Sequence, residues 1–107
     1  MDNTNVQLCS EVLKKEYAKA ISHRTGKHFN SKWLFSPGKS KLVDKIAKEI
    51  KDIRLAKLFI ESQFAMLPPD WCRTTFRKCY PPVNVVFGKN SWLRYGNYIA
   101  DGIKQPA

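Results

Sequence analysis

Apolar residues recur at spacings of three and four along the first quarter of the chain, which indicates an amphipathic helix over residues 5–22. The apolar positions on this side are Val6, Cys9, Leu13, Tyr17, Ala20 and Ile21. We expect Gly26 to end the pattern. Beyond it, Trp33 and Phe35 are expected in a short strand or in an extended segment that fills the core. Both Trp33 and Trp92 are predicted to lie in the core or to line a groove.

A second helix is predicted from Ser36-Pro37, because serine is a favoured helix cap and proline suits the first turn. A cap at Ser40 is the alternative. The expected core positions are Leu42, Val43, Ile46, Ile50 and Ile53. A bend near Asp52 then separates this helix from a third, which runs to about Met66. The third helix is apolar on nearly all sides and is expected to be central and buried.

Two proline pairs bracket the next segment. Pro68-Pro69 ends the third helix, and Asp70 is expected to cap a fourth helix over residues 71–80, which Pro81-Pro82 ends. On this helix Cys72, Phe76 and Cys79 share one face and Arg73, Arg77 and Tyr80 another.

The last quarter has two interpretations. Residues 83–87, VNVVF, are β-branched and apolar, which favours a short strand, and residues 88–90 form a turn. Residues 91–103 fit a helix capped by Ser91, which we favour, or residues 91–95 pair with VNVVF as a hairpin. The expected fold is mainly α, with α+β possible. It is a single basic domain over residues 1–107, with four or five helices and a small β element near 83–95.

Net charge narrows the function class. Nineteen Lys and Arg residues stand against nine Asp and Glu residues, a formal net charge of +10. Such a field attracts polyanions, so nucleic acid is the predicted partner. No apolar run is long enough to cross a bilayer, and the first residues lack the order of a signal peptide. We expect an intracellular protein, cytoplasmic or nucleoid-associated, with no membrane partner.

Lysines supply the first candidate surface. Lys41, Lys45 and Lys48 form a stripe on the second helix, which with Lys39 can follow a phosphate backbone. Gly38-Lys39-Ser40 resembles the end of a phosphate-binding loop, but the earlier glycine and preceding strand of that loop are missing. The alternative interpretation is a helix face that is only solvated.

The fourth helix supplies the second candidate surface, through Arg73, Arg77 and Lys78. A helix, a tight turn and a short helix rich in Arg and Thr are typical of helix-turn-helix readers, which favours DNA slightly over RNA. The hairpin alternative would add a wing with Lys89 at its tip. Lys89 and Arg94 are secondary candidates.

Catalysis, metals and cofactors are not expected. Cys72 and Cys79 are spaced too widely for a zinc pair and, on one helix, for a direct disulfide. His23 and His28 fit a metal-ligand spacing only loosely. Residues 49–51, Glu-Ile-Lys, superficially resemble a nuclease motif but lie in a helical stretch. The rival function is a protein-interaction module, accessory subunit or inhibitor that docks on an acidic or nucleic-acid-binding surface.

Overall fold

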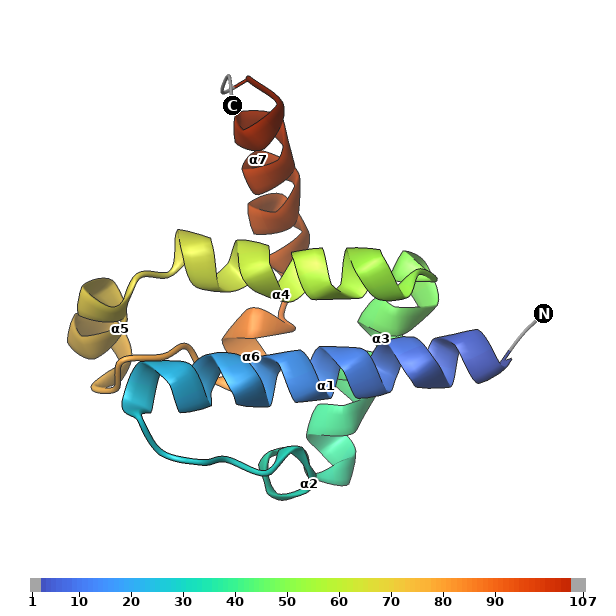
Figure 1. Cartoon of the computed structure of the whole chain (residues 1–107), viewed down its shortest axis with the longest axis horizontal. Coiled ribbons are helices and arrows are strands. Elements are labelled where there is room, and N and C mark those ends of the chain that lie inside the picture. Colours follow the sequence, from blue (N-terminus) through green and yellow to red (C-terminus); the bar gives the residue numbers. More distant parts are fainter. Residues whose placement is uncertain (1–2, 105–107) are drawn as a thin grey trace.

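A computed structural model describes the backbone of residues 3–104 and the side chains of residues 5–101. Within that range the chain is helical and contains no strand. The helices are α1 (Asn3–Thr25), α2 (Ser31–Leu34), α3 (Pro37–Ile50), α4 (Ile53–Met66), α5 (Pro69–Phe76), α6 (Val83–Val86) and α7 (Ser91–Lys104) (Figure 1). The predicted mainly helical fold is therefore confirmed, but the described residues form seven helices where four or five were expected, because α2 and α6 are single helical turns.

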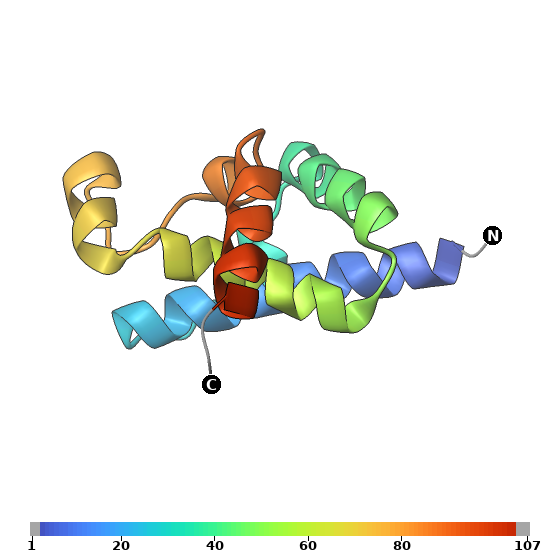
Figure 2. The same ribbon diagram turned by 90° about the horizontal axis from the view of Figure 1, so that it is seen from above.

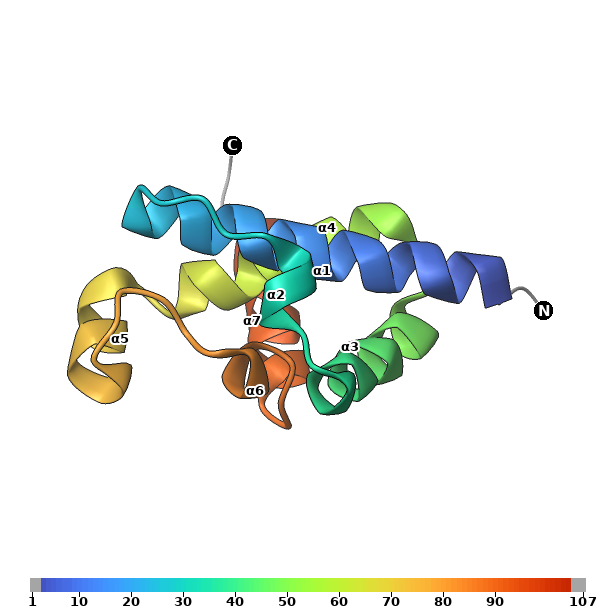
Figure 3. The same cartoon turned by 90° about the horizontal axis from the view of Figure 1, so that it is seen from below.

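The two long helices α1 and α4 lie side by side and form the centre of the molecule (Figures 1 and 2). Helices α5, α6 and α3 line one side of this pair, with α5 and α3 at opposite ends of the long axis (Figures 2 and 3). Helix α7 packs on α4 and projects away from the body (Figure 1). The radius of gyration of 13.6 Å is that of a compact chain of this length.

The core lies between α1, α3, α4 and α6, and it confirms the helical spacing of apolar residues in α1. Tyr17 is its largest fully buried side chain. The Tyr17 ring lies 5.7 Å from Phe35 and 5.9 Å from Phe87, measured between ring centroids. The buried apolar residues of the cluster are Cys9, Leu13, Tyr17, Ile21, Val43, Ile46, Ala47, Ile50, Ala56, Phe59, Ile60, Val83, Val86 and Phe87.

Residues with known capping preferences lie at the starts of α3 and α4 and at the end of α1. The Ser36 side chain accepts a hydrogen bond from the Lys39 N–H at 3.4 Å and caps α3. Asp52 accepts from the N–H groups of Arg54 and Leu55 and caps α4. Gly26 has a positive φ of 71° and its N–H donates to the Ser22 carbonyl, which ends α1.

Residues 83–86 form α6, so the predicted strand and wing are wrong. The chain enters the core after Pro82, and Val83, Val86 and Phe87 are all buried. That burial follows helical spacing, and it outweighs the preference of β-branched residues for strands. Residues 91–104 form α7, as favoured. Ser91 is its first residue, and the Ser91 hydroxyl donates to the Gly88 carbonyl at 2.6 Å instead of capping the helix.

The fourth predicted helix is shorter than expected. Helix α5 ends at Phe76, because Arg77 adopts a left-handed φ of 63° and its N–H donates to the Arg73 carbonyl. Pro68, not Asp70, occupies the cap position, and Asp70 lies in the first turn. The helix-turn-helix arrangement is not confirmed by this geometry.

Several predicted burials are also wrong. Trp33 lies on the single turn of α2 and is 87% exposed, where a strand or a core-filling segment was expected. The central helix α4 is buried on one side only, because Ile53, Leu55 and Met66 are exposed.

Among the described helices, none combines the length and the apolar character that a membrane crossing requires.

Candidate nucleic-acid interface

The lysine stripe of α3 faces solvent. Lys41, Lys45 and Lys48 are exposed, as is Lys39 in the first turn. The other side of α3 packs on α1 through buried aliphatic residues, including Val43. Burial of that side fixes the rotation of the helix, which directs the lysines toward solvent.

Within the part of the chain that the structure describes, none of the stripe lysines forms an ion pair, although Asp44 and Glu49 lie on the same helix. The three ion pairs found there are Lys19–Glu16, Arg54–Asp52 and Arg73–Asp70. Asp44 lies on α3 itself, but it accepts a hydrogen bond from the Ser10 hydroxyl of α1. The stripe therefore keeps a positive charge that an anion can use.

Lys45 and Lys89, which are 44 positions apart, line one hollow of about 650 Å³. The hollow lies where the turn over residues 87–90 approaches α3. Its apolar lining includes Leu42, Ile46 and Phe87, and it also includes Trp92, which is 38% exposed. Trp92 therefore lies at this hollow and not in the core, and Lys45 and Lys89, two predicted site residues, line the same hollow.

The Arg-rich surface is a separate one. Arg73 is exposed and donates to Asp70 at 2.6 Å, which offsets its charge. Lys78 lies with its Nζ 5.4 Å from the centroid of the Tyr80 ring. Because α5 ends before Arg77, the predicted helical face of Arg73, Arg77 and Tyr80 does not form. These residues lie at or just beyond α5, far along the long axis from α3 (Figure 2).

Arg94 is half-buried, and its guanidinium is hydrogen-bonded within the protein. Its guanidinium donates to the Gln63 side-chain oxygen at 2.9 Å and to the Val85 carbonyl at 3.3 Å. Burial disfavours the charged form and lowers the pKa of Arg94 from its ordinary value. We therefore leave Arg94 out of the proposed interface.

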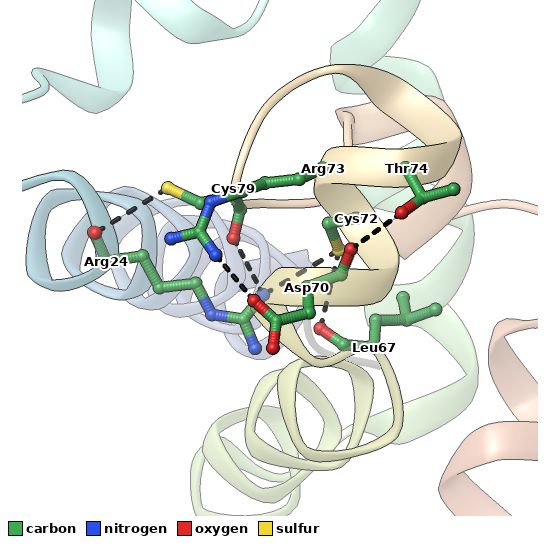
Figure 4. A network of polar contacts seen from close by, with 7 residues as sticks. All are labelled: Arg24, Leu67, Asp70, Cys72, Arg73, Thr74 and Cys79. Carbon is green, nitrogen blue, oxygen red and sulfur yellow. Dashed lines mark hydrogen bonds and ion pairs between the residues drawn. The ribbon is translucent and has the colours of Figure 1, made fainter.

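Arg24 has a structural role that sequence reasoning missed (Figure 4). Its guanidinium donates to the Cys79 carbonyl at 3.1 Å. It also donates to the Phe64 carbonyl at 2.6 Å and lies 4.9 Å from the centroid of the Phe64 ring. The arginine thus joins the end of α1 to the end of α4 and to the segment after α5. One signal was available, since Arg24 follows Tyr17 and Ile21 at helical spacing on the core side.

Cys72 and Cys79 lie beside the same arginine, and both are free thiols. Cys72 is fully buried and its thiol donates to the Leu67 carbonyl at 3.4 Å, while Cys79 lies beyond the end of α5 and donates to the Arg24 carbonyl at 3.6 Å (Figure 4). Burial raises the pKa of Cys72. Over the described residues, no group of three or more His, Cys, Asp or Glu side chains is placed to hold a metal ion.

Comparison with known proteins gives no assignment: no family model, curated protein or solved structure matches this chain. A function therefore has to be inferred from the residues and their geometry.

Proposed function

We propose that this protein binds nucleic acid without catalysing a reaction, and that α3 and the turn over residues 87–90 form the main contact surface. The observation that carries the proposal is the exposed stripe of Lys41, Lys45 and Lys48, for which the described residues provide no ion-pair partner. Cations placed near phosphates release condensed counterions, which favours binding. Lys39 and Lys89 extend the surface, and Arg73, Arg77 and Lys78 form a second, separate one.

The choice between DNA and RNA is left to experiment. The preference for DNA rests on a helix-turn-helix interpretation with a second helix over residues 71–80, whereas α5 ends at Phe76. Phosphate contacts alone carry no sequence information, so the proposal specifies a phosphate backbone and not a base sequence.

A protein partner is the second candidate, and Trp33 is the observation that favours it. This side chain is 87% exposed, and Leu93 is 64% exposed. Tryptophan is enriched among the residues that dominate protein–protein binding. If this candidate is right, a partner recovered by pull-down survives nuclease treatment and is lost with Trp33→Ala.

A salt titration tests the proposed function. Binding to duplex and single-stranded DNA and RNA should weaken steeply as salt concentration rises. The triple variant Lys41→Ala, Lys45→Ala, Lys48→Ala should reduce the slope of log affinity against log salt by up to about 3, roughly 1 for each lysine. Fluorescence anisotropy with labelled 20-residue strands gives both quantities.

A matched variant controls for the loss of charge. Lys15→Ala, Lys27→Ala and Lys57→Ala together remove the same charge from exposed positions outside α3. This control should keep most of the original slope. Absence of binding at low salt would contradict the proposal, and equal effects of the two triple variants would show that α3 is not the contact surface.

A further inference from the structure

The hollow beside Lys45 has the size and the lining of a site for a small flat group. Its volume of about 650 Å³ lies within the range of roughly 300–1,000 Å³ that is usual for small-molecule sites. Leu42 contributes partly exposed apolar surface and Trp92 contributes an aromatic ring, while the lining residues Ile46 and Phe87 are themselves buried. A ligand that fills this space must therefore carry an apolar, preferably aromatic, portion.

The positive charges at the same hollow favour a ligand that carries an anionic group next to its apolar portion. Lys45 and Lys89 are both exposed lining residues, one from α3 and one from the turn before α7. Glu49 is the acidic residue of the lining, and its carboxylate can accept a hydrogen bond from an amino group such as that of cytosine. A nucleobase with its flanking phosphates supplies the aromatic portion, the anionic groups and, in cytosine, the amino group.

Trp92 is held in place for such a contact. Its ring lies 5.2 Å from Phe59 and 5.7 Å from Tyr95 between centroids, both edge-to-face, and Phe59 is fully buried. The packing fixes the ring while leaving part of it open to the hollow. Base–aromatic contacts of this kind stabilise single-stranded complexes without requiring a particular sequence.

We infer that the hollow between α3 and the start of α7 takes one unstacked base of a single-stranded nucleic acid, with Lys45 and Lys89 on the adjacent phosphates. This inference rests on the proposed function and adds the class of nucleic acid. Bases in a duplex are stacked and paired, so they cannot enter the hollow unless the duplex opens. The protein therefore discriminates single strands from duplexes by the base and not by the backbone.

Synthetic strands test the role of the base directly. Three ligands of equal length are compared at one salt concentration: a cytosine DNA strand, an abasic strand, and an abasic strand with a single central cytosine. The cytosine strand should bind about 5- to 100-fold more tightly than the abasic strand, as expected for one stacked base. The strand with a single cytosine should recover most of that difference.

Two variants test the place of the base. Leu42→Trp fills the hollow and keeps every cation, so cytosine and abasic strands should bind this variant with similar affinity. Leu93→Trp makes the same substitution on α7 outside the hollow and should keep the advantage. Trp92→Ala is the second variant, with folding checked by thermal melting, and it should act like Leu42→Trp.

The outcomes separate this inference from the proposed function. If no strand binds at low salt, both fail. If all three strands bind equally with a steep salt dependence, or if Leu42→Trp keeps the advantage of cytosine, the base site is overturned and the backbone interface stands.

Discussion

Tyr17 illustrates how single residues tie distant parts of this chain together. Its ring lies among Phe35, Phe64 and Phe87, and its hydroxyl donates to the Pro81 carbonyl at 2.8 Å across 64 positions. Burial raises the pKa of Tyr17 well above its ordinary value, because the phenolate would lose its hydration. The hydroxyl is therefore kept neutral and available as a donor.

Replacement of this hydroxyl should weaken the fold and change its response to alkali. Tyr17→Phe should lower the free energy of unfolding at pH 7 by about 1–3 kcal/mol, because the Pro81 carbonyl loses its partner. Since the folded pKa exceeds the unfolded value of about 10, the stabilisation is complete below pH 10 and is lost as pH rises above it. The variant should therefore lose less stability than the original protein between pH 9 and pH 11.

Urea denaturation followed by circular dichroism at each pH measures both effects. Tyr80→Phe is the control for removal of a phenolic hydroxyl from a half-buried ring, and it should change the free energy of unfolding at pH 7 less. Parallel curves for Tyr17→Phe and the original protein above pH 10 would contradict the assignment.

At the scale of elements, helices with a local signal at each end could be predicted from the sequence. Helices α3 and α4 begin after Ser36 and Asp52, whose side chains accept the expected backbone hydrogen bonds. The apolar spacing of α3 also indicates which side of this helix is buried, so the exposure of the lysine stripe could be predicted from the sequence. Periodicity and capping are local properties, which is why they can be read without the tertiary structure.

Elements shaped by tertiary contacts could not be predicted in the same way. Residues 83–86 have the composition of a strand, but burial against α1, α3 and α4 makes them helical. The hollow depends on the approach of Lys89 to α3, and the role of Arg24 depends on carbonyls 40 and 55 positions away. Contacts between residues so far apart in the sequence cannot be predicted from periodicity or capping residues, which are local patterns.

Loss of Arg24 should loosen α5 and the segment after it. Arg24→Ala removes the donors to Phe64 and Cys79, and we expect the free energy of unfolding to fall by about 2–3 kcal/mol, since hydrogen bonds from a charged group are involved. Cys72 and Cys79, which surround the arginine, should then react faster with a thiol reagent such as Ellman's reagent. Labelling under native conditions measures this opening.

Arg54→Ala is the matched control, because Arg54 is an exposed arginine whose ion pair joins neighbouring residues at 3.6 Å. It should leave the labelling rates of Cys72 and Cys79 unchanged. Equal rates in Arg24→Ala and in the original protein would show that α5 is held by its apolar contacts alone.

At the scale of the whole molecule, the net charge of +10 opposes the compact state and favours polyanions. Salt acts on both effects, because the Debye length shortens from about 30 Å at 0.01 M to about 10 Å at 0.1 M. Screening should therefore stabilise the fold while it weakens nucleic-acid binding. Because salt should raise the stability of the fold and lower the affinity for nucleic acid, a loss of affinity at high salt can be distinguished from unfolding.

The melting temperature should rise by several degrees between 0.01 M and 0.2 M sodium chloride. Over the same range affinity for a single strand should fall. The triple variant Lys41→Ala, Lys45→Ala, Lys48→Ala should show a smaller rise, because it carries less positive charge. Differential scanning fluorimetry measures the temperatures, and a melting temperature that falls with salt would contradict the role of self-repulsion.

The position of α6 in the chain also bears on biosynthesis. Val83, Val86 and Phe87 complete a core whose other walls come from α1, α3 and α4. The ribosome makes α1, α3 and α4 before α6. A nascent chain that ends before residue 83 therefore exposes the apolar sides of these three helices to solvent. Exposed surface of this kind is what chaperones bind and what drives aggregation. The core can therefore close only after α6 has been made.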